Sequence, residues 1–274
     1  MQLLHSATRN YSWGSRTLIP HLQGQPDSDK PVAELWFGAH PGDPSTVDGR
    51  LLNEVIAEDP AGQLGGRVSA EYGERLPFLL KVLAAEEPLS LQAHPSKAQA
   101  EEGFARENAA GIELTASNRN YKDDNHKPEL IVALTDFYAM AGFRPLARTR
   151  ELFAALECPE LDHYVAMLDD DPSATTESAN LRVLFTTWIT IPSAKRKELI
   201  SAIVAAGERL IAADPADWKS RVMSTVLDLN QRYPGDIGVL GALLLNHIEL
   251  SPGEAVYLDA GQLHAYVSGL GVEI

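Results

Sequence analysis

The sequence predicts a β-rich unit that is interrupted by an all-helical insertion, and three observations support this prediction. Residues 1 to about 50 combine glycine, proline and short apolar runs, which suit short strands joined by loops. From Pro145 to about Tyr233, apolar residues recur at intervals of three and four, as they do on helices. The stretches Glu254–Leu258 and His264–Val267 then return to strand and turn character. An interrupted β unit explains this order most simply.

Each element before the insertion has its own local signal. Leu51–Glu58 has a helical pattern, whereas Leu76–Ala84 is an apolar run broken only by Lys81, which is typical of a buried strand. Ser96 is placed to cap a helix over Lys97–Asn108.

Two further strands precede the insertion. Glu129–Thr135 and Phe137–Arg144 are rich in β-branched and aromatic residues. We therefore expect a β-rich part over residues 1–144, a helical insertion over 145–235 and a return to the β-rich part over 236–274.

Composition excludes several functional classes. The 274 residues include 38 acidic and 23 basic side chains, so the net charge of −15 disfavours binding to nucleic acid. The single cysteine, Cys158, forms no intramolecular disulfide and no Cys-Cys metal site, which suits a reducing compartment. There is no secretory signal and no apolar run of the roughly 20 residues that cross a bilayer. We expect a cytoplasmic protein with no membrane or nucleic-acid partner, and the sequence leaves its oligomeric state open.

Three polar clusters are candidates for chemistry. Gln92 and His94 lie two positions apart, so on a strand they share a face and aim at one point, as metal ligands do. Taken alone, a histidine beside a proline at a strand end is more often a surface residue. Glu129 opens a strand after Pro128, where a carboxylate is costly without a cation or a donor. Taken by itself, this cluster is better explained as a charged, solvated loop.

The third cluster, residues 253–266, places His264 after a tight turn. Its spacing resembles the second conserved motif of the cupin superfamily, with Asp259 in place of a proline and Ser268 in place of an asparagine. In that superfamily the histidine binds a metal inside a small β-barrel.

Four ordered segments together resemble the type I mannose-6-phosphate isomerases: AELWFGAHP at 33–41, LSLQAHP at 89–95, NHKPE at 125–129 and GQLHAY at 261–266. The resemblance implies a mainly β fold with helices, in which a cupin-type jelly-roll β-barrel is interrupted by an all-helical domain. It also implies one zinc ion per chain. The residues at the family's ligand positions are Gln92, His94, Glu129 and His264. Two imidazoles, a carboxylate and an amide oxygen suit zinc and leave room for a water or substrate oxygen.

By the same resemblance, the chain is expected to interconvert mannose 6-phosphate and fructose 6-phosphate by proton transfer through an enediol. Lys81 and Ser90 correspond to phosphate-binding positions, Lys127 to substrate contact or proton transfer, and Glu273 to an active-site glutamate that is the other candidate base. The family continues past this glutamate into a segment that resembles S-D-N-V-x-R-x-G and carries an essential arginine. This sequence stops at Ile274. We therefore expect it to be a fragment or a truncated form with little isomerase activity even when it binds zinc.

Two other functional classes remain open. One is a cupin-like protein that binds a metal and a sugar phosphate without catalysis. The other is an iron-dependent cupin oxygenase, which fits less well because its two-histidine, one-carboxylate triad leaves Gln92 without a role.

Overall fold

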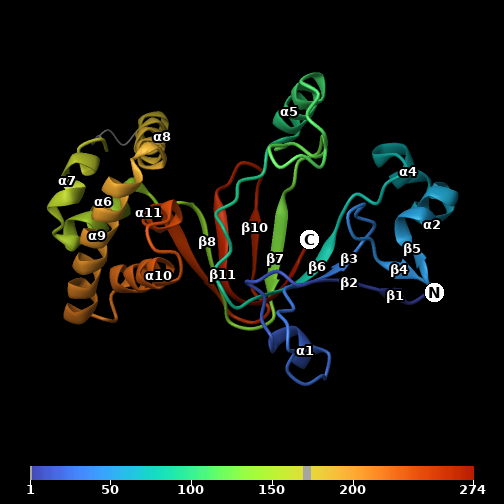
Figure 1. Ribbon diagram of the computed structural model, residues 1–274, viewed down its shortest axis with the longest axis horizontal. Helices are drawn as coiled ribbons and strands as arrows, with labels where there is room; N and C mark the ends of the chain where they lie inside the picture. Colours follow the sequence, from blue (N-terminus) through green and yellow to red (C-terminus); the bar gives the residue numbers. More distant parts are fainter. Residues whose placement is uncertain (1, 169–173) are drawn as a thin grey trace. The chain divides into compact units, whose positions relative to one another are not determined.

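A computed structural model describes residues 2–168 and 174–274 of the chain. The chain forms two compact units, one from Met1–Ala139 with Ile248–Ile274 and the other from Met140–His247 (Figure 1). It passes from one unit to the other within strands β8 (Phe137–Phe143) and β9 (Leu245–Leu250). No described helix is both long enough and apolar enough to cross a membrane.

The first unit is built on an antiparallel sheet whose strands follow the order β10-β7-β11-β6-β3-β2. Their bounds are Ala7–Arg9 for β2, Glu34–Phe37 for β3, Leu80–Ala85 for β6, Glu129–Ala133 for β7, Ala255–Leu258 for β10 and His264–Glu273 for β11. A smaller sheet joins β1 (Leu4–His5), β4 (Thr46–Val47) and β5 (Arg50–Leu51). Because β11 pairs with β7 on one side and β6 on the other, it brings distant parts of the sequence together.

Short helices connect the strands of this unit. They are α1 (Leu18–Leu22), α2 (Leu52–Glu58), α3 (Pro60–Leu64), α4 (Gly66–Tyr72) and α5 (Lys97–Ala109). The predicted cap of α5 is present, because the Ser96 hydroxyl accepts from the Gln99 N–H while the Gln99 side chain accepts from the Ser96 N–H. This reciprocal pair satisfies two N–H groups at the helix start and fixes where α5 begins.

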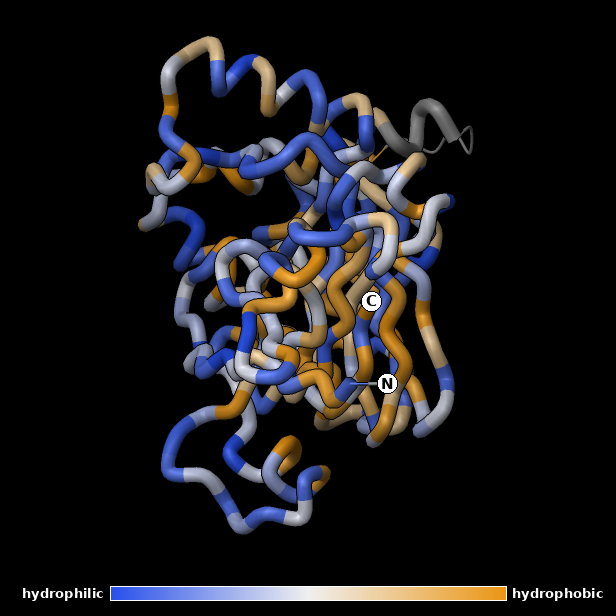
Figure 2. The backbone as a smooth tube through the Cα atoms, turned by 90° about the vertical axis from the view of Figure 1, so that its right-hand side faces the viewer, coloured by the Kyte–Doolittle hydropathy of each residue, from blue (hydrophilic) through white to orange (hydrophobic). Residues whose placement is uncertain are grey.

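The core of the first unit forms where α1 packs on the sheet. Ile19 of α1 is buried against Leu35 of β3, Ala84 of β6 and Leu270 of β11. Apolar stretches follow the strands near the C-terminus (Figure 2). Burial of the isoleucine and leucine side chains contributes about 1.5–3 kcal/mol each, so this cluster stabilises the sheet that carries the polar residues described below.

The second unit is helical, as the insertion was predicted to be. Its helices are α6 (Leu146–Leu156), α7 (Pro159–Val165), α8 (Ala174–Thr190), α9 (Ser193–Ala213), α10 (Trp218–Arg232) and α11 (Ile237–Ala242). Trp188 is fully buried at its centre, with the rings of Phe153 and Tyr164 6.3 and 6.0 Å away. The recurring apolar positions of the sequence therefore pack on one another in this unit.

One predicted element was wrong in its bounds, and two elements were missed. The strand expected over Leu76–Ala84 begins only at Leu80, and Pro77 has no N–H to donate to a neighbouring strand. Helix α1 was not predicted because it spans only five residues and contains a proline. Strand β9 was also missed, since its start belongs to the apolar run that began as a helix at Ile237.

Candidate active site

Two of the polar clusters are held together by backbone pairing. Gln92 and His264 form an antiparallel bridge in which the Gln92 N–H donates to the His264 carbonyl at 2.8 Å and the His264 N–H donates back at 2.9 Å. The Gly261 N–H donates to the carbonyl of His94 at 2.6 Å. Directly opposed residues of an antiparallel pair carry their side chains on the same face. The amide of Gln92 and the imidazole of His264 therefore project from the same side.

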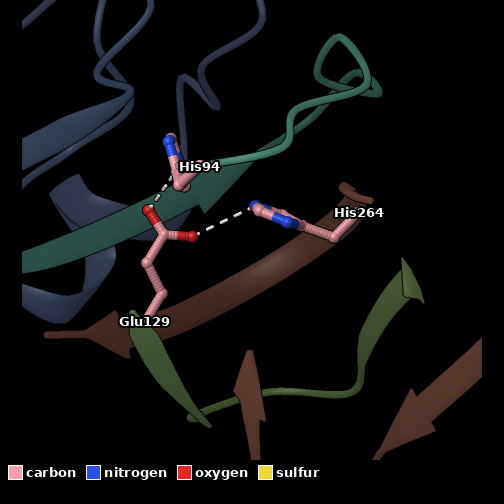
Figure 3. Close-up of side chains that lie close together, drawn as sticks. All are labelled: His94, Glu129 and His264. Carbon is pink, nitrogen blue, oxygen red and sulfur yellow. Dashed lines mark ion pairs between the residues drawn. The ribbon is translucent and has the colours of Figure 1, made fainter. Parts of the chain in front are cut away.

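Glu129 joins this pair from the start of β7. Its carboxylate lies between two imidazoles (Figure 3), with Oε1 3.2 Å from Nε2 of His94 and Oε2 3.1 Å from Nε2 of His264. One nitrogen or oxygen atom from each of the three side chains lies within 4.8 Å of the others. This convergence is the arrangement that a single cation needs.

Hydrogen bonding fixes the orientation of one imidazole. Nδ1 of His264 lies 2.9 Å from the carbonyl oxygen of Gln262, which only accepts, so Nδ1 carries a proton and donates it. This leaves Nε2 facing Glu129. A second contact of this kind orients metal-binding histidines in proteins.

The electrostatics of the cluster favour the charged forms of Glu129 and His264. Burial would raise the pKa of Glu129, but its contacts with His264 and His94 outweigh burial and lower this pKa to about 2. Burial would lower the pKa of His264, but Glu129 and the Gln262 carbonyl outweigh it and raise this pKa. Glu129 therefore stays an anion and attracts positive charge into the site.

The three side chains fit a zinc ion by their chemistry. Neutral imidazole nitrogens and a carboxylate oxygen are common zinc donors, and the Gln92 amide on the same face supplies another oxygen. Nε2 of His94 is buried and, among the described residues, has no hydrogen-bond partner despite its proximity to Glu129. Such an atom is costly unless something binds it, and a metal ion would satisfy it.

The partly buried Lys81 and the buried Glu273 form an ion pair on the same sheet. The two residues are directly paired between β6 and β11, and Nζ of Lys81 lies 2.5 Å from Oε2 of Glu273. Glu273 is also paired with Ile131, two residues after Glu129, so all three polar side chains lie on one face. Burial would lower the pKa of Lys81, but the carboxylates of Glu273 and Glu34 outweigh it and raise this pKa. Lys81 therefore remains a cation.

Glu34 is a further buried carboxylate that the sequence reasoning did not select. It lies on β3, two residues before Trp36, which pairs with Lys81, and its Oε2 accepts from the Trp36 indole N–H at 2.7 Å. Burial raises the pKa of Glu34, although Lys81 and Trp36 act in the opposite direction. The apolar neighbours Ala33 and Leu35 mark Glu34 as a carboxylate on a strand, but the cation that it meets depends on the pairing of β3 with β6.

Ser90 and Lys127 are placed differently from the other candidates. Ser90 is exposed, and Lys127 is half exposed with its Nζ 3.1 Å from Oδ2 of Asp123. Within residues 2–168 and 174–274, neither makes a hydrogen bond or ion pair with another predicted site residue. Their expected roles stay predictions.

Comparison with known proteins gives the same family as the four sequence segments. The family model of the phosphomannose isomerase type I catalytic domain matches residues 1–146. The mannose-6-phosphate isomerase of Escherichia coli strain K12 is 39% identical over 282 residues, which cover 100% of this chain and 68% of that protein. The chain belongs to the type I phosphomannose isomerase family. Mannose-6-phosphate isomerase 2 of Arabidopsis thaliana is 35% identical, with 100% of this chain and 64% of the relative covered.

Solved structures of this family confirm the predicted cupin-type fold with its helical part. The Salmonella typhimurium mannose 6-phosphate isomerase bound to fructose 6-phosphate and zinc matches with a TM-score of 0.86 and 36% identity. The match covers 100% of this chain and 67% of that one. A second mannose 6-phosphate isomerase structure, which holds zinc and yttrium, matches with the same TM-score at 37% identity.

Proposed function

We propose that this chain is a zinc-dependent aldose-ketose isomerase that interconverts mannose 6-phosphate and fructose 6-phosphate in the cytoplasm. The observation that carries the proposal is the convergence of His94, Glu129 and His264 on one point, on the same face as the Lys81–Glu273 pair. Family membership supports the choice of substrate, because a relative with the same fold binds fructose 6-phosphate and zinc.

In this proposal Gln92, His94, Glu129 and His264 hold the metal. Bound there, zinc supplies a positive charge that polarises substrate oxygens. The Gln262 carbonyl accepts from Nδ1 of His264, so Nε2, which faces Glu129, is the nitrogen that would bind the metal. Glu129 makes the site anionic before it is filled, so the ligands attract a cation.

Lys81 and Ser90 are proposed to bind the phosphate, and Glu273 or Lys127 to move the proton. Lys81 remains protonated, as an anion-binding lysine must. Glu273 is nearly fully buried and held by Lys81, so its carboxylate has a fixed position from which to exchange a proton. In the open-chain sugar, the base removes the proton from C2 and returns it to C1. Meanwhile the O2 hydroxyl loses its proton and the O1 carbonyl gains one, so the enediol resolves into the ketose.

The test is exchange of the C1 protons of fructose 6-phosphate with solvent deuterium, followed by NMR in the zinc-loaded chain. This readout detects proton abstraction even when net turnover is slow. We expect exchange that is lost in Glu129→Gln and retained in His21→Gln, a change at an exposed histidine. Zinc-dependent binding of fructose 6-phosphate with no exchange above the Glu129→Gln background would overturn the isomerase proposal. It would favour a non-catalytic binding protein.

A further inference from the structure

The helical unit contains a cavity with a basic lining. It has a volume of about 330 Å³, within the range of small-molecule sites. The charged side chains among its lining residues are Arg144, Arg148 and Arg221, and no described lining residue is acidic. The chain has a net charge of −15, but three guanidinium groups make the lining of this cavity positive.

Arg144 is the buried member of the group. Its Nη1 and Nη2 donate to the carbonyl oxygens of Leu243 and Leu245 at 3.0 and 2.6 Å. Within the described part of the chain it pairs with no carboxylate, and only 5% of the residue is exposed. A buried charge without a counter-ion is costly. Burial, followed by the charge of Arg148, lowers the pKa of Arg144 to about 10.

Trp218, the first residue of α10, brings the positive charges together. Cζ of Arg148 lies 4.1 Å from the centroid of its indole ring, and Cζ of Arg144 lies 5.5 Å from it. Arg148 is also paired with Glu151 at 2.8 Å, but both side chains are about half exposed, so this ion pair exchanges readily. The indole holds the two guanidinium groups beside the cavity without neutralising either of them.

The remaining lining adds to the positive potential. Pro145 precedes the first turn of α6, which has no acidic residue, so the positive end of the helix dipole lies at the cavity. Arg221 is exposed, and its Nη1 donates to the carbonyl of Ala216 at 2.8 Å. Both features favour an anion and disfavour a cation.

We propose that this cavity binds a small molecule bearing a compact oxyanion, either a phosphate or a carboxylate group, held by Arg144, Arg148 and Arg221 beside the Trp218 ring. Guanidinium groups make paired, charge-assisted hydrogen bonds with both oxyanions. The bound group would be the counter-ion that Arg144 lacks. The site lies wholly within the helical unit and uses none of the residues of the metal cluster.

The experiment titrates the full chain with inorganic phosphate and, separately, with citrate, following binding by calorimetry. Because Arg144 is buried, the variants are at the exposed positions, Arg148→Gln and Arg221→Gln. Arg209→Gln is the control, since Arg209 is exposed on α9 and donates only to the carbonyl of Ala205 among the described residues. Lys81→Met serves as a second control, because phosphate can also bind at the proposed active site.

We expect at least one of the two anions to bind, with Kd rising about tenfold or more in each cavity variant, as loss of a charged hydrogen-bond donor requires. Binding should be unchanged in Arg209→Gln. In Lys81→Met, the anion binding that depends on the cavity arginines should still be detected. The stronger anion identifies phosphate or carboxylate as the preferred group. Three results would each overturn the proposal. The first is that the wild type and both cavity variants bind with equal affinity, and the second is that neither anion binds. The third is that Lys81→Met abolishes binding while the cavity variants do not.

Discussion

The contribution of the ion pair between Lys81 and Glu273 to the free energy of unfolding can be measured. In Lys81→Met, the Glu273 carboxylate keeps its buried position, with 4% of its side chain exposed, but loses its cation. Removing one partner of a buried pair costs about 3–5 kcal/mol. Lys81 keeps 21% of its side chain exposed, so the lower end of this range applies.

We therefore expect Lys81→Met to lower the free energy of unfolding by about 3 kcal/mol at pH 7. The assay is urea unfolding of the metal-free wild type and variant at this pH. The double variant Lys81→Met/Glu273→Gln should recover most of the loss. An equal loss in the single and the double variant would show that lost packing, and not the unpaired carboxylate, accounts for the effect.

Three further changes test other parts of the account. Gly269→Ala should lower the free energy of unfolding by about 3 kcal/mol, because φ is +121° and the added Cβ would lie 2.6 Å from the Asp136 carbonyl. Gly66→Ala, where nothing lies within 4 Å, is its urea-unfolding control and should change little. Ser96→Ala removes a capping box and should cost about 1 kcal/mol in the same assay. Burial lowers the pKa of His247 to about 4, so the unfolded chain takes up a proton near pH 6.5, whereas the folded chain takes it up only near pH 4. The contribution of neutral His247 to the free energy of unfolding is present above pH 6.5 and is lost as pH falls to 4, by up to about 3 kcal/mol. His247→Gln should flatten the stability profile between these pH values.

Local sequence signals predicted the regular elements well. Ser96 capped a helix where it was expected, because the capping box depends only on residues three positions apart. The helical periodicity after Pro145 likewise produced a helical unit. Pro77 shows the limit of hydrophobic runs: the apolar stretch continues through it, but the strand does not, because pairing also requires an N–H.

The site could be predicted only in part, because its geometry arises from non-local pairing. Gln92 and His264 are 172 positions apart, and no local pattern shows that they form a bridge. The family resemblance supplied what spacing could not. Glu34 was overlooked although its segment was recognised, since its burial beside Lys81 depends on the register between β3 and β6. The basic cavity could not be predicted either, because Arg144 lies between β8 and α6, Arg148 on α6 and Arg221 on the distant α10.

The central claim, that His94, Glu129 and His264 hold one metal ion, is tested most directly by element-resolved metal analysis of purified protein. We expect one zinc per chain in the wild type and in the control His21→Ala, whose histidine is exposed. Far less zinc is expected in Gln92→Ala and His264→Ala, with Glu129→Gln affected most because it also removes the charge that attracts the cation. Retention of one zinc per chain in all three site variants would contradict the account.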